Sequence, residues 1–138
     1  MAEQRPSYGP AITLDAAKKV AVAAVAEARK NAWNVAIAIV DTHGLLTYFE
    51  RLDDTQTAAP RIAVAKARTA AMFRRPSSGF EETVAKGRLA VLGLPGATPV
   101  TGGVPIMVAG RVIGGIGVSG VASDQDEQIA RAGVSALA

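Results

Sequence analysis

Cysteine is absent from this chain of 138 residues, and histidine occurs once. A chain without cysteine has no disulfide, no thiolate metal site and no catalytic thiol, and one histidine cannot build a histidine cage within a single subunit. Aromatic residues number only six, and no apolar run approaches the roughly 18 residues of a membrane-spanning helix. These absences exclude most thiol and metal chemistry, and we expect no membrane partner.

Alanine and glycine are abundant instead, with 28 and 14 residues, and hydrophobic residues make up 49% of the chain. That composition supplies one hydrophobic core, and the length fits one domain. The 15 basic and 12 acidic residues are interspersed and leave a net charge of +3, which argues against a nucleic-acid partner. The first ten residues lack the apolar stretch of a secretory signal. We therefore expect a tail over residues 1–12, one domain over residues 13–138, and a cytoplasmic protein.

Hydrophobic periodicity and turn residues predict the order helix, two strands, two helices, two strands, helix. Two hairpins separated by helices favour an α+β fold, in which helices flank one antiparallel sheet, over a doubly wound α/β fold. The sheet is expected to have four strands, or five if residues 97–103 add a short one. Ser123 is expected to cap the last helix, with Asp126 at its third position. The expected helices span residues 14–31, 60–75, 78–92 and 123–137, and the expected strands span residues 34–41, 44–51, 104–108 and 111–119.

Lys66 falls within the apolar stripe of the predicted helix over residues 60–75, near Phe73. A buried ammonium without a partner is costly, so this lysine must reach solvent, pair with a carboxylate or meet an anionic ligand. Two interpretations stay open. Lys66 forms a salt bridge with Asp41 or Asp53, or it contacts a ligand and serves as a general base.

Arg51 ends a predicted strand, on the same face as Phe49. Its planar guanidinium suits bidentate binding of a carboxylate ligand. The alternative is a surface ion pair with Asp53 or Asp54, and the residue types permit either role.

A loop rich in glycine and proline spans residues 94–103 and ends in Thr101, Gly102 and Gly103. Such loops often line sites, and a threonine hydroxyl with the backbone N–H groups of two glycines would suit an anion. The loop lacks the lysine of a phosphate-binding loop and the glycine spacing of a dinucleotide site. We therefore treat these three residues as ligand-binding candidates, with an ordinary crossover loop as the alternative.

His43 lies in the sequence Asp-Thr-His-Gly at the tip of the first predicted hairpin. It is the only side chain whose ordinary pKa lies near neutrality, and the only histidine available to bind haem iron. The simpler interpretation is an exposed turn residue. In an oligomer, the hairpin tip would also be able to reach the pocket of a neighbouring subunit.

Four segments carry a resemblance to a known family: AIAIVDTHGLLTYFERLDD, IAVAKARTAAMF, GLPGATPVTGGVPIMVAGRVIGGIGVSG and SDQDEQIARAG. From about Thr13 to the C-terminus, the chain resembles the GlcG/HbpS-like, haem-degrading domain family. Three positions depart from the family pattern. Asp54 stands where glycine is common, Thr101 stands where another polar residue is expected, and His43 stands where small or acidic residues are frequent.

The resemblance implies a small sandwich of profilin-like or PAS-like architecture, and homo-oligomers built from dimers into tetramers, hexamers or octamers. It also implies that haem or a related tetrapyrrole is the ligand, with propionates paired to Arg51, Lys66 or Arg74. The iron would then lie near His43 or Thr101. Family membership does not settle activity. Two other functions fit the residues: a catabolic enzyme or sensor for a small hydroxy or aromatic acid held by Lys66 and Arg51, and a structural oligomerisation module.

Overall fold

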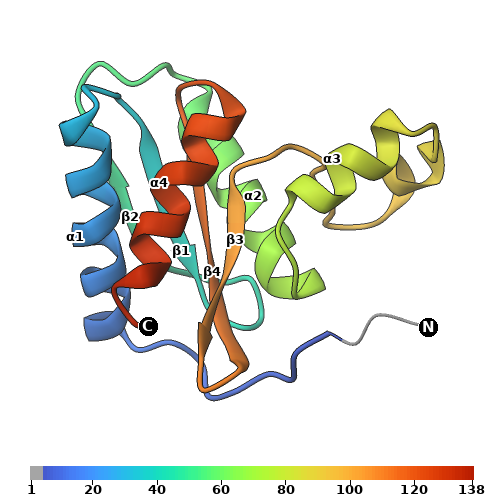
Figure 1. Cartoon of the computed structure of the whole chain (residues 1–138), viewed down its shortest axis with the longest axis horizontal. Helices are drawn as coiled ribbons and strands as arrows, with labels where there is room; N and C mark the ends of the chain where they lie inside the picture. Colours follow the sequence, from blue (N-terminus) through green and yellow to red (C-terminus); the bar gives the residue numbers. More distant parts are fainter. Residues whose placement is uncertain (1–4) are drawn as a thin grey trace.

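The sheet is antiparallel throughout and has the strand order β2-β1-β4-β3 (Figure 1). The computed structural model describes residues 5–138. Its strands are β1 (Ala36–Val40), β2 (Leu46–Arg51), β3 (Gly103–Val108) and β4 (Arg111–Ser119). Its helices are α1 (Leu14–Lys30), α2 (Ala59–Phe73), α3 (Ser78–Ala85), the short 3-10 helix η1 (Leu89–Gly93) and α4 (Ser123–Ser135). The predicted α+β class and order of elements are confirmed.

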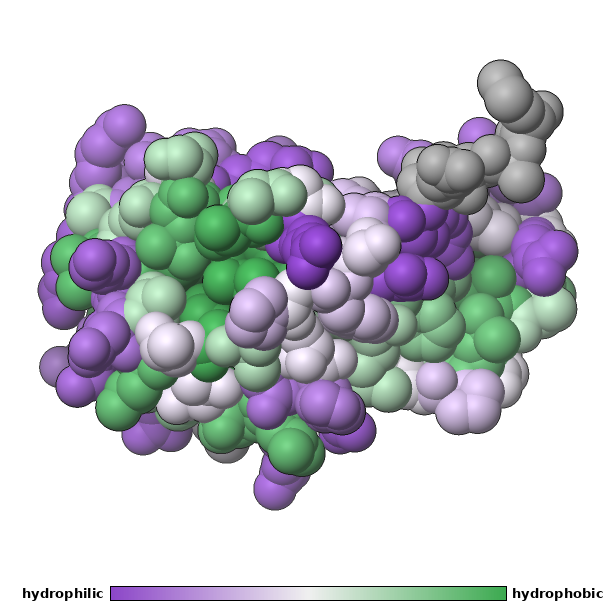
Figure 2. Space-filling model, turned by 90° about the horizontal axis from the view of Figure 1, so that it is seen from below, coloured by the Kyte–Doolittle hydropathy of each residue, from purple (hydrophilic) through white to green (hydrophobic). Residues whose placement is uncertain are grey.

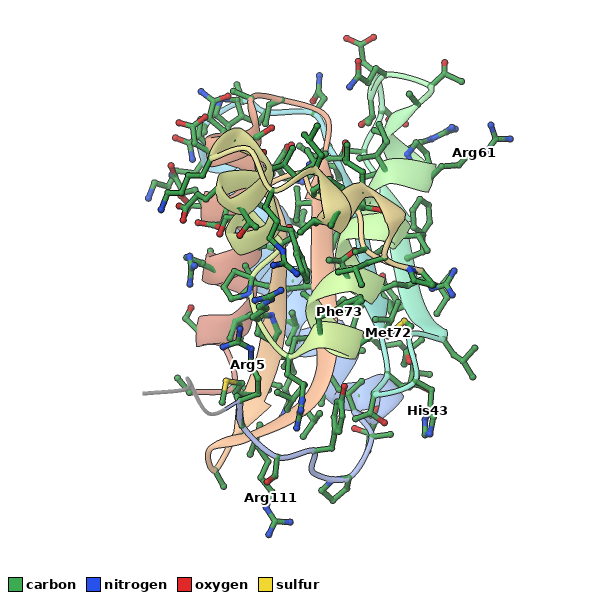
Figure 3. All side chains as sticks on the ribbon, turned by 90° about the vertical axis from the view of Figure 1, so that its right-hand side faces the viewer. Arg5, His43, Arg61, Met72, Phe73 and Arg111 are labelled. Carbon is green, nitrogen blue, oxygen red and sulfur yellow. The ribbon has the colours of Figure 1, made fainter. Side chains whose placement is uncertain are left out.

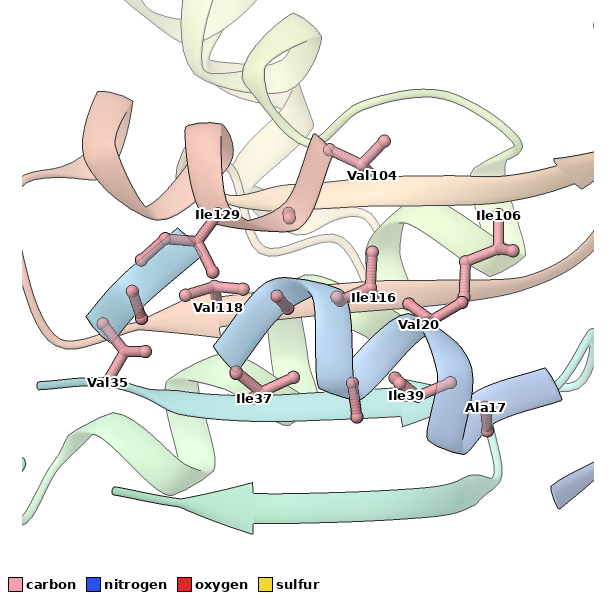
Figure 4. Packing of buried hydrophobic residues seen from close by; sticks show 14 of the residues in the cluster. Ala17, Val20, Val35, Ile37, Ile39, Val104, Ile106, Ile116, Val118 and Ile129 are labelled. Atoms are coloured by element: carbon pink, nitrogen blue, oxygen red, sulfur yellow. The ribbon is translucent and has the colours of Figure 1, made fainter. Parts of the chain in front are cut away.

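Helices cover both faces of the sheet, with α1 and α4 on one face and α2 on the other (Figure 1). The core beneath α1 and α4 is built from branched aliphatic side chains such as Ile37, Ile116 and Ile129 (Figure 4). The core beneath α2 is mostly alanine, and a Cβ at Gly117 of β4 would collide with the carbonyl oxygen of Ala63. Alanines of α2 and glycines of β4 thus allow this helix to approach the sheet closely. Among the described residues, no helix combines the length and apolar character that a bilayer crossing requires.

The predicted helix over residues 78–92 is two pieces in the structure. Helix α3 ends at Ala85, and Gly87 then adopts a φ of +100°, a conformation that favours glycine and interrupts the helix before η1. The fifth strand considered for residues 97–103 is absent from the described structure, where only Gly103 of that segment belongs to a strand.

The cap of the last helix also differs from the prediction. Helix α4 begins at Ser123 with Ala122 as its N-cap residue, and the Ala122 N–H donates to Oε1 of Gln125 at 3.3 Å. The expected capping pair of Ser123 and Asp126 is therefore wrong. The Asp126 carboxylate is engaged by groups outside the helix, described below.

Residues 5–12 form a segment, here called the strap, that runs along the end of the sheet (Figure 1). Tyr8 makes a parallel bridge with Val112 of β4, and its hydroxyl donates to the carbonyl oxygen of Ala71 at 2.8 Å. The strap thereby joins the sheet to the C-terminal end of α2.

Helices α3 and η1 project from the body of the molecule as an arm (Figure 1). Large apolar side chains are exposed on it, with Leu89 at 63% and Leu92 at 60%. Seen from below, hydrophobic surface lies toward the arm end as well as over the body, with hydrophilic side chains between (Figure 2). The arm thus carries apolar surface that the rest of the described chain does not cover.

Candidate functional site

A groove of about 520 Å³ lies beside β3, the strand at one open edge of the sheet. Four parts of the chain meet there: the strap, the end of α2 with the turn that follows, β3 and the C-terminal half of α4. We call it the basic groove. Its lining residues are Arg5, Pro6, Arg74, Arg75, Pro76, Val104, Pro105, Met107, Arg131 and Val134.

Two of its four arginines are held by aromatic rings. The Arg74 guanidinium lies 5.3 Å from the centre of the Tyr8 ring, and Nη1 of Arg74 donates to the carbonyl oxygen of Pro6 at 3.2 Å. The Arg75 guanidinium lies 3.8 Å from the centre of the Phe80 ring. Rings in these positions orient the two cations and attract them. Both guanidinium groups are thus positioned before any ligand arrives.

Positive charge dominates the basic groove. The Nε of Arg131 lies 3.2 Å from Oε2 of Glu127, one turn earlier on α4, and this pair is partly exposed. Val104, Pro105 and Val134 supply an apolar floor. Guanidinium groups around such a floor suit a ligand with an apolar body and anionic groups at its edge, because arginine binds carboxylates in a planar, bidentate manner.

A second cavity, of about 360 Å³, continues the basic groove toward the arm. The two cavities share Arg5, Arg75 and Pro76, so they are parts of one depression. The first turns of α3 form its far wall. Its remaining lining residues are Ser78, Gly79 and Thr83.

Lys66 is enclosed in an ion pair away from the basic groove. Its Nζ donates to Oδ2 of Asp126 and to the carbonyl oxygen of Val118, each at 3.0 Å, and both charged side chains are only 2% exposed. The N–H of Val121 donates to the other Asp126 oxygen at 3.2 Å. Burial raises the pKa of the Asp126 carboxyl, and the Lys66 ammonium and this N–H offset the rise only in part. The pair fastens α2 to the end of β4 and the start of α4.

Lys66 forms a salt bridge, which was one of its two interpretations. The prediction that its partner is Asp41 or Asp53 is wrong. Asp41 instead closes the turn after β1, where its Oδ1 accepts from the N–H groups of His43 at 2.8 Å and Leu45 at 3.1 Å. Asp53 is exposed in the connection after β2. The true partner lies 60 residues along the chain, on a helix that only the tertiary fold brings to Lys66.

The glycine pair of the loop lies against Lys66. A Cβ at Gly102 would stand 2.7 Å from the Lys66 Nζ, and one at Gly103 would collide with the Lys66 carbonyl oxygen. The Gly103 N–H donates to Ser77 Oγ at 2.9 Å, and the Thr101 N–H donates to Oε1 of Glu81 at 2.9 Å. The structure therefore brings Gly102 and Gly103 to Lys66, where they allow β3 to pass close to α2, whereas Thr101 contacts Glu81 of α3.

Arg51 and His43 lie apart from this cluster. Arg51 is exposed on β2, the opposite edge strand from β3. His43 is exposed on the turn after β1, and in Figure 3 the C-terminal half of α2 lies between it and Arg5 of the basic groove. Within residues 5–138, no three histidine, aspartate or glutamate side chains gather in a way that would hold a metal ion.

Of the residues named from the sequence, only Arg74 lines the basic groove. Arg5 and Arg131 were missed because they stand far from Arg74 in the sequence, and Arg75 was missed although it follows Arg74 directly. The pair Arg74–Arg75, directly before Pro76 at a predicted helix end, was the one local signal.

Known proteins share this architecture. The family model described as haem degrading protein HbpS-like matches residues 12–135. The protein GlcG of Escherichia coli K12 is 45% identical over 103 residues, which cover 75% of this chain and 77% of GlcG. A crystal structure of HbpS superposes with a TM-score of 0.87 at 33% identity and covers 100% of this chain and 99% of its own. A crystal structure of a PduOC–haem complex superposes with a TM-score of 0.82 at 28% identity and covers 91% and 94%.

Proposed function

This chain belongs to the HbpS-like family of haem-degrading proteins, and on that premise we propose that it binds haem or a related tetrapyrrole in the basic groove. One observation carries the proposal: four guanidinium groups surround an apolar floor in a single groove. Haem has a complementary distribution of groups, with carboxylates at one edge of a flat apolar ring. The relative crystallised as a PduOC–haem complex supports this class of ligand.

The donor set of the groove fits such a ligand. Arg131 lies at the exposed side, where it can bind a carboxylate at the cost of a weak surface contact with Glu127. Arg74 and Arg75 are already oriented by Tyr8 and Phe80, so they lose little side-chain freedom on binding. Bound haem would supply the redox chemistry of its iron. The protein's own contribution is to hold, orient and partly desolvate it.

We also propose that the protein works as a homo-oligomer, assembled from dimers into a tetramer, hexamer or octamer. The exposed Leu89 and Leu92 of the arm support this, because apolar side chains gathered on a projecting element are typical of subunit contacts. A neighbouring subunit would also cover the open side of the basic groove, and its hairpin tip would be able to present His43. Light scattering on the wild type and on Leu92→Asp tests this, and an unchanged particle mass in the variant would refute a role for the arm.

An organic acid held by Lys66 and Arg51 has less support from the geometry. Lys66 is 2% exposed and fully engaged with Asp126 and Val118, so a ligand would have to break that ion pair. Arg51 is exposed on the edge strand β2. We therefore place the anionic edge of the ligand at the arginines of the basic groove.

Haemin titration followed by the Soret band tests the proposal. We expect a saturable spectrum with one haem per subunit, and weaker binding by Arg131→Gln. Arg61→Gln is the matched control, since Arg61 is an exposed helical arginine that does not line the groove. Absence of a saturable spectrum, or equal binding by the two variants, would contradict the proposal.

A further inference from the structure

Few side chains of this protein have atoms that bind haem iron in proteins, which are imidazole, thiolate, thioether and phenolate groups. Cysteine is absent, and the chain has one histidine, three methionines and two tyrosines. Tyr8 donates its hydroxyl proton to the Ala71 carbonyl oxygen and lies beneath Arg74. Tyr48 lies on β2 at the opposite sheet edge, and its hydrogen bond to Glu50 raises the pKa of the phenol. Neither tyrosine is therefore arranged to offer a phenolate to the basic groove.

Methionine offers a second class of ligand atom, and two of the three methionines are described. Met72 packs its sulfur toward Gly44 and Gly96, and a Cβ at Gly44 would stand 3.0 Å from that sulfur. It thus lies with the turn that carries His43, and neither residue lines the basic groove. Met107 does line it, on the edge strand β3.

We propose that the thioether sulfur of Met107 is the ligand that this chain gives to haem iron, an inference that rests on the proposed function. Among the described side chains that line the basic groove, it is the only one with an iron-binding atom of these kinds. Its neighbours on the floor, Val104 and Pro105, are purely apolar.

The local backbone places Met107 at the groove. Ile106 pairs with Gly114 but Met107 pairs with Val112, so Ile113 is an extra residue on β4 and forms a bulge at this step. That bulge bends β4, while on β3 successive side chains still point to opposite faces of the sheet. Ile106 is fully buried in the core, whereas Met107 is half-buried and reaches the groove.

The chemistry of a thioether suits this place. It is neutral and polarisable, so a half-buried methionine needs no counter-charge, and it does not compete with the carboxylates of the ligand for the arginines that line the groove. A thioether ligand raises the reduction potential of haem iron. It also takes up no proton at ordinary pH, unlike a histidine.

Haemin titration, absorption spectra and the reduction potential of the complex test this with the full chain. Met107→Leu keeps an apolar side chain of similar size, and Met72→Leu is the matched control. We expect both variants to bind one haem per subunit. In Met107→Leu the spectrum should change and the reduction potential should fall, while Met72→Leu should match the wild type.

The outcomes separate the two proposals. If Met107→Leu binds haem with the spectrum and potential of the wild type, Met107 is not the ligand, although haem binding stands. If His43→Ala alters the spectrum and Met107→Leu does not, the ligand is the histidine and the inference is overturned. If the wild-type protein gives no saturable haem spectrum, both proposals fail together.

Discussion

The buried pair of Lys66 and Asp126 gives the sharpest prediction about stability. Replacing Asp126 with leucine leaves the Lys66 ammonium 2% exposed, with only the Val118 carbonyl oxygen as a described acceptor. Replacing Lys66 with methionine leaves the carboxylate buried, with the Val121 N–H as its remaining donor. Removing one partner of a buried ion pair typically costs about 3–5 kcal/mol. We expect each single variant to lose free energy of unfolding of that order.

The double variant Lys66→Met/Asp126→Leu should cost no more than either single variant. An apolar pair of similar volume removes both desolvation costs, although the Val118 carbonyl and the Val121 N–H lose their partners, at about 1–3 kcal/mol for each. Urea unfolding followed by circular dichroism measures all four proteins. The difference between the double variant and the sum of the single variants then gives the coupling free energy.

The cost of Lys66→Met should depend on pH. Burial already raises the pKa of the Asp126 carboxyl above 3.8, and loss of the ammonium should raise it further. The folded variant then binds more protons than its unfolded chain between 3.8 and the raised pKa, so its stability falls as pH rises through that window. We expect a smaller deficit relative to wild type at mildly acidic than at mildly alkaline pH. Additive single variants with a deficit independent of pH would refute this interpretation of the pair.

Three further predictions concern how the parts are held. Gly117→Ala should destabilise the fold by several kcal/mol, since its Cβ would collide with the Ala63 carbonyl oxygen on α2. Thermal unfolding measures this loss, and an unchanged Tm would contradict the close approach of α2 to β4. Arg74→Gln should cost about 1 kcal/mol by releasing the Pro6 carbonyl oxygen, and amide exchange in the strap should accelerate; unchanged exchange would contradict that. Phe80→Ala should cost about 3–5 kcal/mol in urea unfolding, because the ring is fully buried, and a loss below about 1 kcal/mol would contradict its place in the core.

The fold was predictable because its elements follow local rules. Strand β4 begins and ends at the predicted residues, since its β-branched residues and glycines lie between the turn at Ala109–Gly110 and Gly120. Helix α1 begins at Leu14 as predicted, and the Thr13 side chain caps it by accepting from the Ala16 N–H. The helix after Ser77 was extended too far, because its apolar pattern continues past Gly87, where positive φ breaks it.

The contacts of the candidate site were harder to predict, because they join residues far apart in the sequence. The apolar stripe showed that Lys66 is buried but gave no means of choosing its partner, and Asp126 had a plausible local role as a cap residue. In the sequence alone, Arg131 is an ordinary cation toward the C-terminal end of a predicted helix. Only the fold shows that it meets Arg5 and the α2 end around the edge of β3.

Hydrogen exchange measured with and without haemin tests most directly whether the basic groove holds the ligand. Haemin should slow amide exchange in β3 from Val104 to Met107, in the strap, and around Arg131 and Val134 of α4. Exchange in the turn at His43 should change little in a complex held within one subunit. Protection confined to that turn and to the loop over residues 94–101, with β3 unchanged, would contradict the proposal that the basic groove is the binding site.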